Sequence, residues 1–241
     1  MALERLDKLL ASTGQWSRKE VKELVKQGRV LAGETKVNRP EEKFDPDCTE
    51  LRVDGEVVLC APFVYVMMHK PEGILSATED RDQRTVLDLL PRHLQRRGLF
   101  PVGRLDKDTT GLLLLTDNGP LAHELLSPKK HVDKVYLAHV DGHTDEEDTA
   151  ALAQGMVLGD GLRCLPAGLE PLGDGSSCLV TLREGKYHQV KRMLAARGKP
   201  VLQLKRLSMG PLNLDEDLKP GEWRLLKPEE QNALISAAKK C

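Results

Sequence analysis

The sequence has few of the residues that define the more specialised classes of protein. Its 241 residues include only five cysteines, at positions 48, 60, 164, 178 and 241, and no two are spaced as C-x-x-C. The odd count and this spacing argue against a disulfide framework and a zinc site, and they predict reduced thiols and a cytoplasmic location. No stretch reaches the roughly 20 apolar residues that span a bilayer, so we expect no association with a membrane.

Aromatic residues are also scarce, at 3% of the chain, and neither sign of charge predominates. The 36 Lys and Arg residues stand against 37 Asp and Glu residues, for a formal net charge of −1. This balance does not exclude nucleic acid as a partner, because the average can hide a local basic patch. The 40% of hydrophobic residues predicts a globular chain with one large domain or two modest ones.

The first 60 residues read as a small separate unit. Leucines recur at helical spacing near the N-terminus, and a second helix is predicted to begin after Ser17, with Glu20 as its partner in a capping box. Gly28 is a natural end for that helix. Short segments of β-strand character follow, in RVLAG, TKVN and ELRVDGEVV, and residues 60–62 are predicted to form a linker.

The second predicted helix has a basic side. Arg18, Lys22 and Lys26 are spaced by four residues and so share one face, with Lys19 beside them. Arg29 would extend this side. A solvated helix face is the ordinary interpretation of such a run. Few acidic residues interrupt it, however, and this favours a surface that binds the phosphates of a nucleic acid.

The same N-terminal segment resembles the S4 RNA-binding fold. The resemblance rests on RLDKLLA, a turn, and SRKEVKELVKQGRV, and it covers about residues 3–58. It implies a small S4 (α-L-like) domain at 1–60. S4 modules are binding units that are often attached to RNA enzymes, so the resemblance implies RNA as a partner without naming a reaction.

Residues 61–241 mix strand-like and helical segments without strict alternation. Strands are expected in FVYVMMHK, GLLLLT, KVYLAHV, SCLVTLRE and PVLQLKRLSMG. Helices are expected in TVLDLLPRHL, PLAHELLSP, DEEDTAALAQG, HQVKRMLAARG and EEQNALISAAKK. This mixture predicts an α+β domain with a mixed, largely antiparallel sheet.

The segment GRLDKDTTGLLLLT, residues 103–116, carries the strongest chemical signal. Asp106, Asp108 and Gly111 match the first, third and sixth positions of a calcium-binding EF-hand loop. Four leucines follow at 112–115, where such a loop needs oxygen ligands, so we predict a buried strand and no bound metal. The residues alone leave two alternatives: a loop that presents a catalytic carboxylate, or a turn capped by Asx and hydroxyl groups.

Extended to GRLDKDTTGLLLLTDNG, this segment resembles the signature around the catalytic aspartate of the RsuA-type pseudouridine synthases. Four further blocks agree in order: MMHKPEGILSAT, SPKKHVDKVYLAHV, LREGKYHQVKRMLAARG and LDEDLKPGEWRLL. The resemblance implies an enzyme that isomerises a specific uridine to pseudouridine in ribosomal RNA, with Asp106 as the catalytic residue. The Asp-Thr-Thr-Gly form looks closer to the enzymes that act on small-subunit (16S) RNA.

The implied reaction breaks the bond from uracil N1 to the ribose and rejoins the base through C5. It needs no redox cofactor, because nothing is oxidised on balance. An ionised carboxylate serves as nucleophile or base, and a cation must keep it charged in a pocket that excludes water. The family places a basic residue of HQVKRM against the aspartate. We favour Arg192 over Lys191, because a guanidinium can form two hydrogen bonds with a carboxylate.

A uridine that leaves its stack needs support in the pocket. By the resemblance, Tyr136 matches the residue that packs on the base. Arg104 is a candidate to fill the space that the base leaves. His188 and Gln189 either contact RNA or cap the helix that follows them.

We therefore expect a monomeric, cytoplasmic synthase that needs no cofactor and binds ribosomal RNA or a small-subunit assembly intermediate. A large-subunit RNA target is an alternative. Another is a non-catalytic RNA-binding or ribosome-assembly protein with the same fold. The intact surroundings of Asp106 favour the enzyme.

Overall fold

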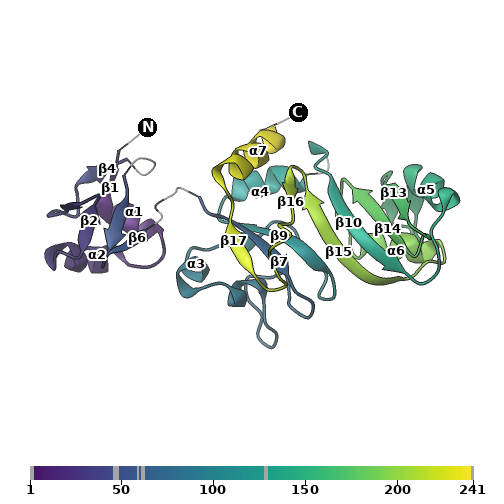
Figure 1. The fold of residues 1–241 in the computed structure, drawn as a ribbon, viewed down its shortest axis with the longest axis horizontal. Coiled ribbons are helices and arrows are strands. Elements are labelled where there is room, and N and C mark those ends of the chain that lie inside the picture. Colours follow the sequence, from purple (N-terminus) through teal and green to yellow (C-terminus); the bar gives the residue numbers. More distant parts are fainter. Residues whose placement is uncertain (1–2, 46–48, 59, 61–62, 128–129, 240–241) are drawn as a thin grey trace. The chain divides into compact units, whose positions relative to one another are not determined.

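The computed structural model describes residues 3–45, 49–58, 60, 63–127 and 130–239 (Figure 1). Contacts divide the chain into two compact units, one of residues 1–64 and 90–99 and the other of residues 65–89 and 100–241. The predicted boundary after residue 60 assigns residues 90–99 to the second domain, whereas their contacts place them in the smaller unit. In the described part of the chain, no helix is both long enough and apolar enough to cross a membrane.

In the N-terminal part of the smaller unit, two helices accompany a small sheet, and residues 90–99 add a third helix, α3 (Arg92–Arg96). Helix α1 spans Leu6–Ser12, and helix α2 spans Arg18–Lys26. The predicted capping box is confirmed at the start of α2, where the hydroxyl of Ser17 accepts from the backbone N–H of Glu20 and the Glu20 carboxylate accepts from that of Ser17. The sheet has the order β3-β2-β5-β6, and β1 pairs with β4. The strands are β1 (Glu4–Arg5), β2 (Val30–Ala32), β3 (Thr35–Lys36), β4 (Lys43–Phe44), β5 (Leu51–Val53) and β6 (Glu56–Val58).

The core of the smaller unit is formed by the apolar faces of both helices and the inner side of the sheet. On α2, Val21, Leu24 and Val25 are buried, as their helical spacing predicts. Cys60 is buried in the same core, so the segment predicted as a linker begins inside this unit. Ala61 and Pro62 lie outside the described residues.

The larger unit is built on a nine-stranded sheet. Its main path is β13-β14-β10-β15-β9-β7-β17, with β16 paired to β15 and β8 paired to β9. All of these pairs are antiparallel except β15 with β9, which pair over only two residue pairs. The strands are β7 (Tyr65–Lys70), β8 (Phe100–Pro101), β9 (Thr110–Thr116), β10 (Lys134–Val140), β13 (Gly168–Leu172), β14 (Ser177–Leu182), β15 (Val201–Met209), β16 (Leu212–Asn213) and β17 (Trp223–Leu225). A separate hairpin joins β11 (Met156–Val157) and β12 (Arg163–Cys164).

Helices cover the sheet, and α4 and α7 lie side by side (Figure 1). The helices of this unit are α4 (Gly119–Leu126), α5 (Glu146–Ala153), α6 (Gln189–Ala196) and α7 (Pro228–Lys239). The helix predicted over TVLDLLPRHL is wrong in its continuity, because it divides into a 3-10 turn at Val86–Leu89, in the larger unit, and helix α3 at Arg92–Arg96, in the smaller one. Pro91 explains the break, since proline disfavours helical backbone in the residue before it.

The central strands are buried on both faces. Leu112, Leu113, Leu114 and Leu115 in β9 are all fully buried. Leu112 and Leu114 belong to the core that α4 and α7 cover. The prediction of a buried strand at this position, in place of an oxygen-rich calcium loop, is confirmed.

Candidate active site

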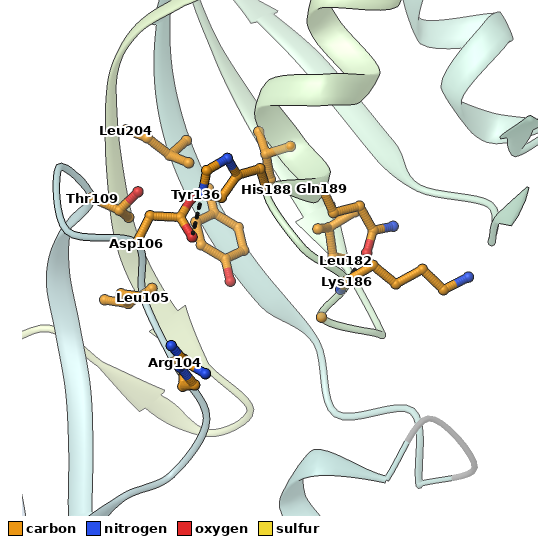
Figure 2. A pocket seen from close by; sticks show the side chains of 12 residues that line it. Arg104, Leu105, Asp106, Thr109, Tyr136, Leu182, Lys186, His188, Gln189 and Leu204 are labelled. Atoms are coloured by element: carbon orange, nitrogen blue, oxygen red, sulfur yellow. Dashed lines mark hydrogen bonds and ion pairs between the residues drawn. The ribbon is translucent and has the colours of Figure 1, made fainter. Parts of the chain in front are cut away.

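A pocket lies beside the loop that precedes β9 (Figure 2). Its walls come from that loop, from β10 and β15, from the end of β14, and from the start of α6. The parallel pair β9–β15 therefore lies next to it. The lining residues are Arg104, Leu105, Asp106, Thr109, Tyr136, Leu182, Gly185, Lys186, His188, Gln189, Val190 and Leu204.

A buried lysine at the end of β7 anchors the loop. The Nζ atom of Lys70 donates to the carbonyl oxygens of Pro71, Lys107 and Thr109, at 3.0, 3.2 and 2.9 Å. Burial lowers the pKa of Lys70 to about 8, although the nearby carboxylates of Asp108 and Asp106 oppose this shift. Sequence reasoning assigned this lysine no role, since only the folded chain brings residue 70 to the loop.

Two further contacts fix the ends of the loop. The hydroxyl of Ser76 donates to the carbonyl of Leu105 and accepts from the N–H of the same residue, at 2.9 and 3.1 Å. At the other end, Gly111 has a φ of 103°, and a Cβ atom there would lie 2.2 Å from the carbonyl oxygen of Arg206. Glycine is therefore required where β9 meets β15.

Two basic side chains approach the carboxylate of Asp106, whose side chain is 26% exposed. The Nε2 atom of His188 lies 3.5 Å from Oδ1, and the Nζ atom of Lys191 lies 3.6 Å from Oδ2. Lys191 is shared, because its Nζ atom lies 2.5 Å from Oδ1 of Asp108. This hydrogen bond lowers the pKa of Asp108. The arrangement places one ammonium group within 3.6 Å of both carboxylates.

Our preference for Arg192 as the partner of Asp106 is not supported. The Nη2 atom of Arg192 lies 2.5 Å from Oδ1 of Asp160, whereas the Nζ atom of Lys191 lies 3.6 Å from Oδ2 of Asp106. Successive residues of a helix point about 100° apart, so α6 directs Lys191 to the loop and its neighbour elsewhere. The hydrogen-bonding capacity of a guanidinium could not reveal this difference in direction.

The other pocket residues differ in how exposed they are to solvent. Tyr136 is 8% exposed, and its ring lies in the pocket close to Asp106 (Figure 2). Arg104 is exposed and also lines the pocket. The hydroxyl of Thr109, a residue that is 1% exposed, has no hydrogen-bond partner within the described residues. Sequence reasoning did not single out Thr109.

The structure distinguishes the two residues that begin α6. His188 occupies the position before the helix with a left-handed φ of 48°, but its side chain makes no capping hydrogen bond and faces Asp106 (Figure 2). Gln189 braces the preceding loop instead. Its Oε1 atom accepts from the N–H of Lys186 at 3.0 Å, and its Nε2 atom donates to Glu184 at 2.7 Å.

The predicted phosphate-binding face belongs to the smaller unit. Arg18, Lys19, Lys22 and Lys26 are exposed on α2. Arg29 is also exposed but forms a two-point ion pair with Asp54, at 2.5 and 2.6 Å. In the segments that the structure describes, no group of three or more His, Cys, Asp or Glu side chains is arranged to hold a metal ion.

Comparison with known families identifies the larger unit. Residues 64–196 match the family described as RNA pseudouridylate synthase, and residues 4–47 match the S4 domain. The chain belongs to the RNA pseudouridylate synthase family. The resemblance stated from the motifs and the α+β fold class are thereby confirmed, and the synthase isomerises uridine to pseudouridine.

The synthase is similar to characterised and uncharacterised relatives along almost its entire length. It is 50% identical to the Bacillus subtilis protein named uncharacterized RNA pseudouridine synthase YtzG, over 95% of this chain and 98% of the relative. It is 40% identical to ribosomal small subunit pseudouridine synthase A of Vibrio cholerae, over 94% and 97%. A crystal structure of a pseudouridylate synthase, 35% identical, matches with a TM-score of 0.67 over 96% of this chain and 99% of that one.

Proposed function

We propose that the synthase acts on small-subunit ribosomal RNA and that Asp106 is its catalytic residue. The observation that carries the assignment of Asp106 is its place in the pocket, where it is the only carboxylate among the described lining residues. The names of the relatives from Vibrio cholerae, Pasteurella multocida and Pseudomonas aeruginosa support the choice of RNA, since each is called ribosomal small subunit pseudouridine synthase A.

The geometry suggests how these residues share the chemistry. The target uridine leaves its stack and its base packs against Tyr136. Asp106 acts as nucleophile or base while the bond from N1 to the ribose breaks, the base turns, and C5 forms the new bond and loses its hydrogen. Lys191 stabilises the negative charge of Asp106, which partial burial would otherwise disfavour. Arg104, exposed at the pocket, enters the space that the uridine leaves.

The two parts of the chain divide the work in this proposal. Residues 1–60 bind RNA through the exposed cations of α2, and residues 61–241 carry out the isomerisation. The reaction proceeds without cofactor or metal, in the cytoplasm, and with the protein as a monomer. Ribosomal RNA enters either as free RNA or within a small-subunit assembly intermediate.

Tritium release tests the assignment directly, because the hydrogen at uracil C5 must leave in each turnover. The wild type, assayed with a metal chelator present, should release tritium from small-subunit RNA labelled at C5, either free or partly assembled. Asp106→Asn should reduce release by roughly 1,000-fold or more while binding RNA within about twofold of the wild type. Asp108→Asn is the matched control and should retain most of the turnover.

Each other outcome has a definite meaning. Turnover by Asp106→Asn near the wild-type rate would show that Asp106 is not the catalytic residue. Tritium release from large-subunit RNA alone would show that the substrate is large-subunit RNA and not small-subunit RNA. Loss of release with chelator, restored by added calcium, would contradict the metal-free reaction.

A further inference from the structure

An aromatic side chain beside the pocket is left almost entirely in solvent. Tyr187 is 75% exposed, although it directly precedes the pocket residue His188. Its ring is nevertheless held in place, since it lies parallel to the His188 ring with centroids 3.9 Å apart and planes 15° apart. One face of the Tyr187 ring is therefore covered, and its exposure leaves the other face available.

The stack is connected to the proposed catalytic group. Within the pair, His188 approaches Asp106, because its Nε2 atom lies 3.5 Å from Oδ1 of the carboxylate. The backbone beneath the stack is braced by Gln189, which is buried and bonded to Lys186 and Glu184. The two rings are thus preorganised, so a ligand that stacks on Tyr187 has little side-chain entropy to remove.

We propose that the free face of Tyr187 is a stacking platform for a nucleobase adjacent to the target uridine. This inference rests on the proposed function. When the uridine leaves its stack, its neighbour also loses a stacking partner, and an exposed aromatic ring can replace that partner. A base on Tyr187 would extend the stack of Tyr187 and His188, and the His188 ring in turn approaches Asp106 through its Nε2 atom.

The surroundings favour a nucleic-acid base over an apolar segment of a protein. Arg104 and Lys186 line the same pocket, and the ammonium group of Lys186 can contact a phosphate beside a base. Lys186 itself pairs with Glu184 at 3.0 Å. A single flat ring among charged groups matches a base with its charged backbone, whereas the cores of protein interfaces are depleted of charged residues.

A pair of substitutions isolates the aromatic ring. Tyr187→Leu keeps apolar bulk but removes the ring, whereas Tyr187→Phe keeps the ring and removes only the hydroxyl. The probe is a fragment of small-subunit RNA that contains the uridine modified by the wild type, with the flanking bases replaced one at a time by abasic sites. Val157→Ala, which alters an exposed apolar residue that does not line the pocket, controls for general surface effects.

We expect Tyr187→Leu to weaken binding of the intact fragment roughly five- to 150-fold, and Tyr187→Phe to leave it nearly unchanged. One abasic position should weaken binding by the wild type to a similar extent and cause no further loss in Tyr187→Leu. At that position, 2-aminopurine should be quenched on binding to the wild type and much less on binding to Tyr187→Leu.

Two outcomes would overturn the inference by itself. One is unchanged affinity of Tyr187→Leu for the intact fragment. The other is an equal loss in Tyr187→Leu on intact and on every abasic RNA, which would mean that the ring only positions His188. If the wild type released no tritium from any ribosomal RNA, the proposed function would fail first, and this inference with it.

Discussion

Helix α2 in the smaller unit exposes all four of its basic side chains, whereas the larger unit buries Lys70, Lys134 and Arg206. The exposed cations remain hydrated and free to exchange counterions for phosphates. The buried ones donate to backbone carbonyls: Lys134 to Val132 at 3.1 Å and Arg206 to Leu112 at 2.8 Å. Burial, followed by repulsion from Arg206, lowers the pKa of Lys134 to about 8. Lys and Arg thus provide a phosphate-binding surface in the smaller unit, whereas in the larger unit their buried side chains hold segments of backbone in place.

Of the changes that test this comparison, charge reversal on α2 should have the largest effect, and the quantity it should change is the affinity for RNA. Replacing Arg18, Lys22 and Lys26 by Glu should weaken RNA binding by roughly 100-fold near 0.1 M salt and reduce the salt slope by about two to three, because three phosphate contacts are lost. Filter binding over a salt series would measure both quantities.

The matched control reverses Lys219, Lys227 and Lys239, three exposed lysines of the larger unit, with the same change in net charge. If this control weakened RNA binding as much as the change on α2, the overall charge of the protein would determine its affinity, and the exposed cations of α2 would not form a specific RNA-binding face.

The neighbouring cations of α6 provide the next test, because only one of them meets the loop. Lys191→Met should lower the turnover number about 10- to 100-fold, since Asp106 loses its nearest ammonium group. Arg192→Met should change it less than about twofold, because that side chain pairs with Asp160. Single-turnover kinetics at saturating enzyme would separate turnover from binding. The reverse order of effects would favour Arg192 as the partner of Asp106.

Thr109 contrasts with the buried lysines Lys70 and Lys134, since its buried hydroxyl has no partner among the described residues while their ammonium groups are hydrogen-bonded. Thr109→Val removes this unpaired group with little change in shape, so stability should hold or rise. If the hydroxyl bonds to the substrate, turnover should fall roughly three- to tenfold. Thr110→Val, whose hydroxyl donates weakly to Leu204 at 3.4 Å, is the control and should leave turnover unchanged. Loss of stability in Thr109→Val would show that the hydroxyl already has a structural partner.

The smallest effect concerns the pH dependence of stability at Lys70. Its pKa is about 8 in the folded chain and near 10.5 when unfolded, so the unfolded state binds more protons between these values. The buried charge of Lys70 should therefore destabilise the folded protein fully below about pH 8. Above that pH the lysine loses its proton in the folded state, and the free energy of unfolding should rise. Between pH 7 and 9, the free energy of unfolding should increase by about 1 kcal/mol more in the wild type than in the variant Lys70→Met. Denaturant titrations of both proteins would measure the difference, and a constant difference would mean that Lys70 does not titrate in this range.

Several elements could be predicted because their causes lie within a few residues. The capping box of α2 needs only Ser17 and Glu20, and the buried strand β9 needs only its run of leucines. By contrast, β17 at Trp223–Leu225 was not predicted, although its sequence belonged to a recognised block. Three residues carry little periodicity, and this strand forms because it pairs with β7.

The position of Asp106 in the loop before a buried strand was already contained in the sequence, and so were the fold class and the exposed basic side of α2. Local spacing and turn chemistry determine each of these. Only the tertiary structure decided that Lys191 meets the loop, that Lys70 anchors it, and that Tyr187 stacks on His188. The first two contacts join residues 83 and 37 or more positions apart. The third joins neighbouring residues, of which His188 has a left-handed backbone with a φ of 48°. The direction of a side chain on α6 follows from how that helix lies against the sheet, and no pattern within the helix specifies this.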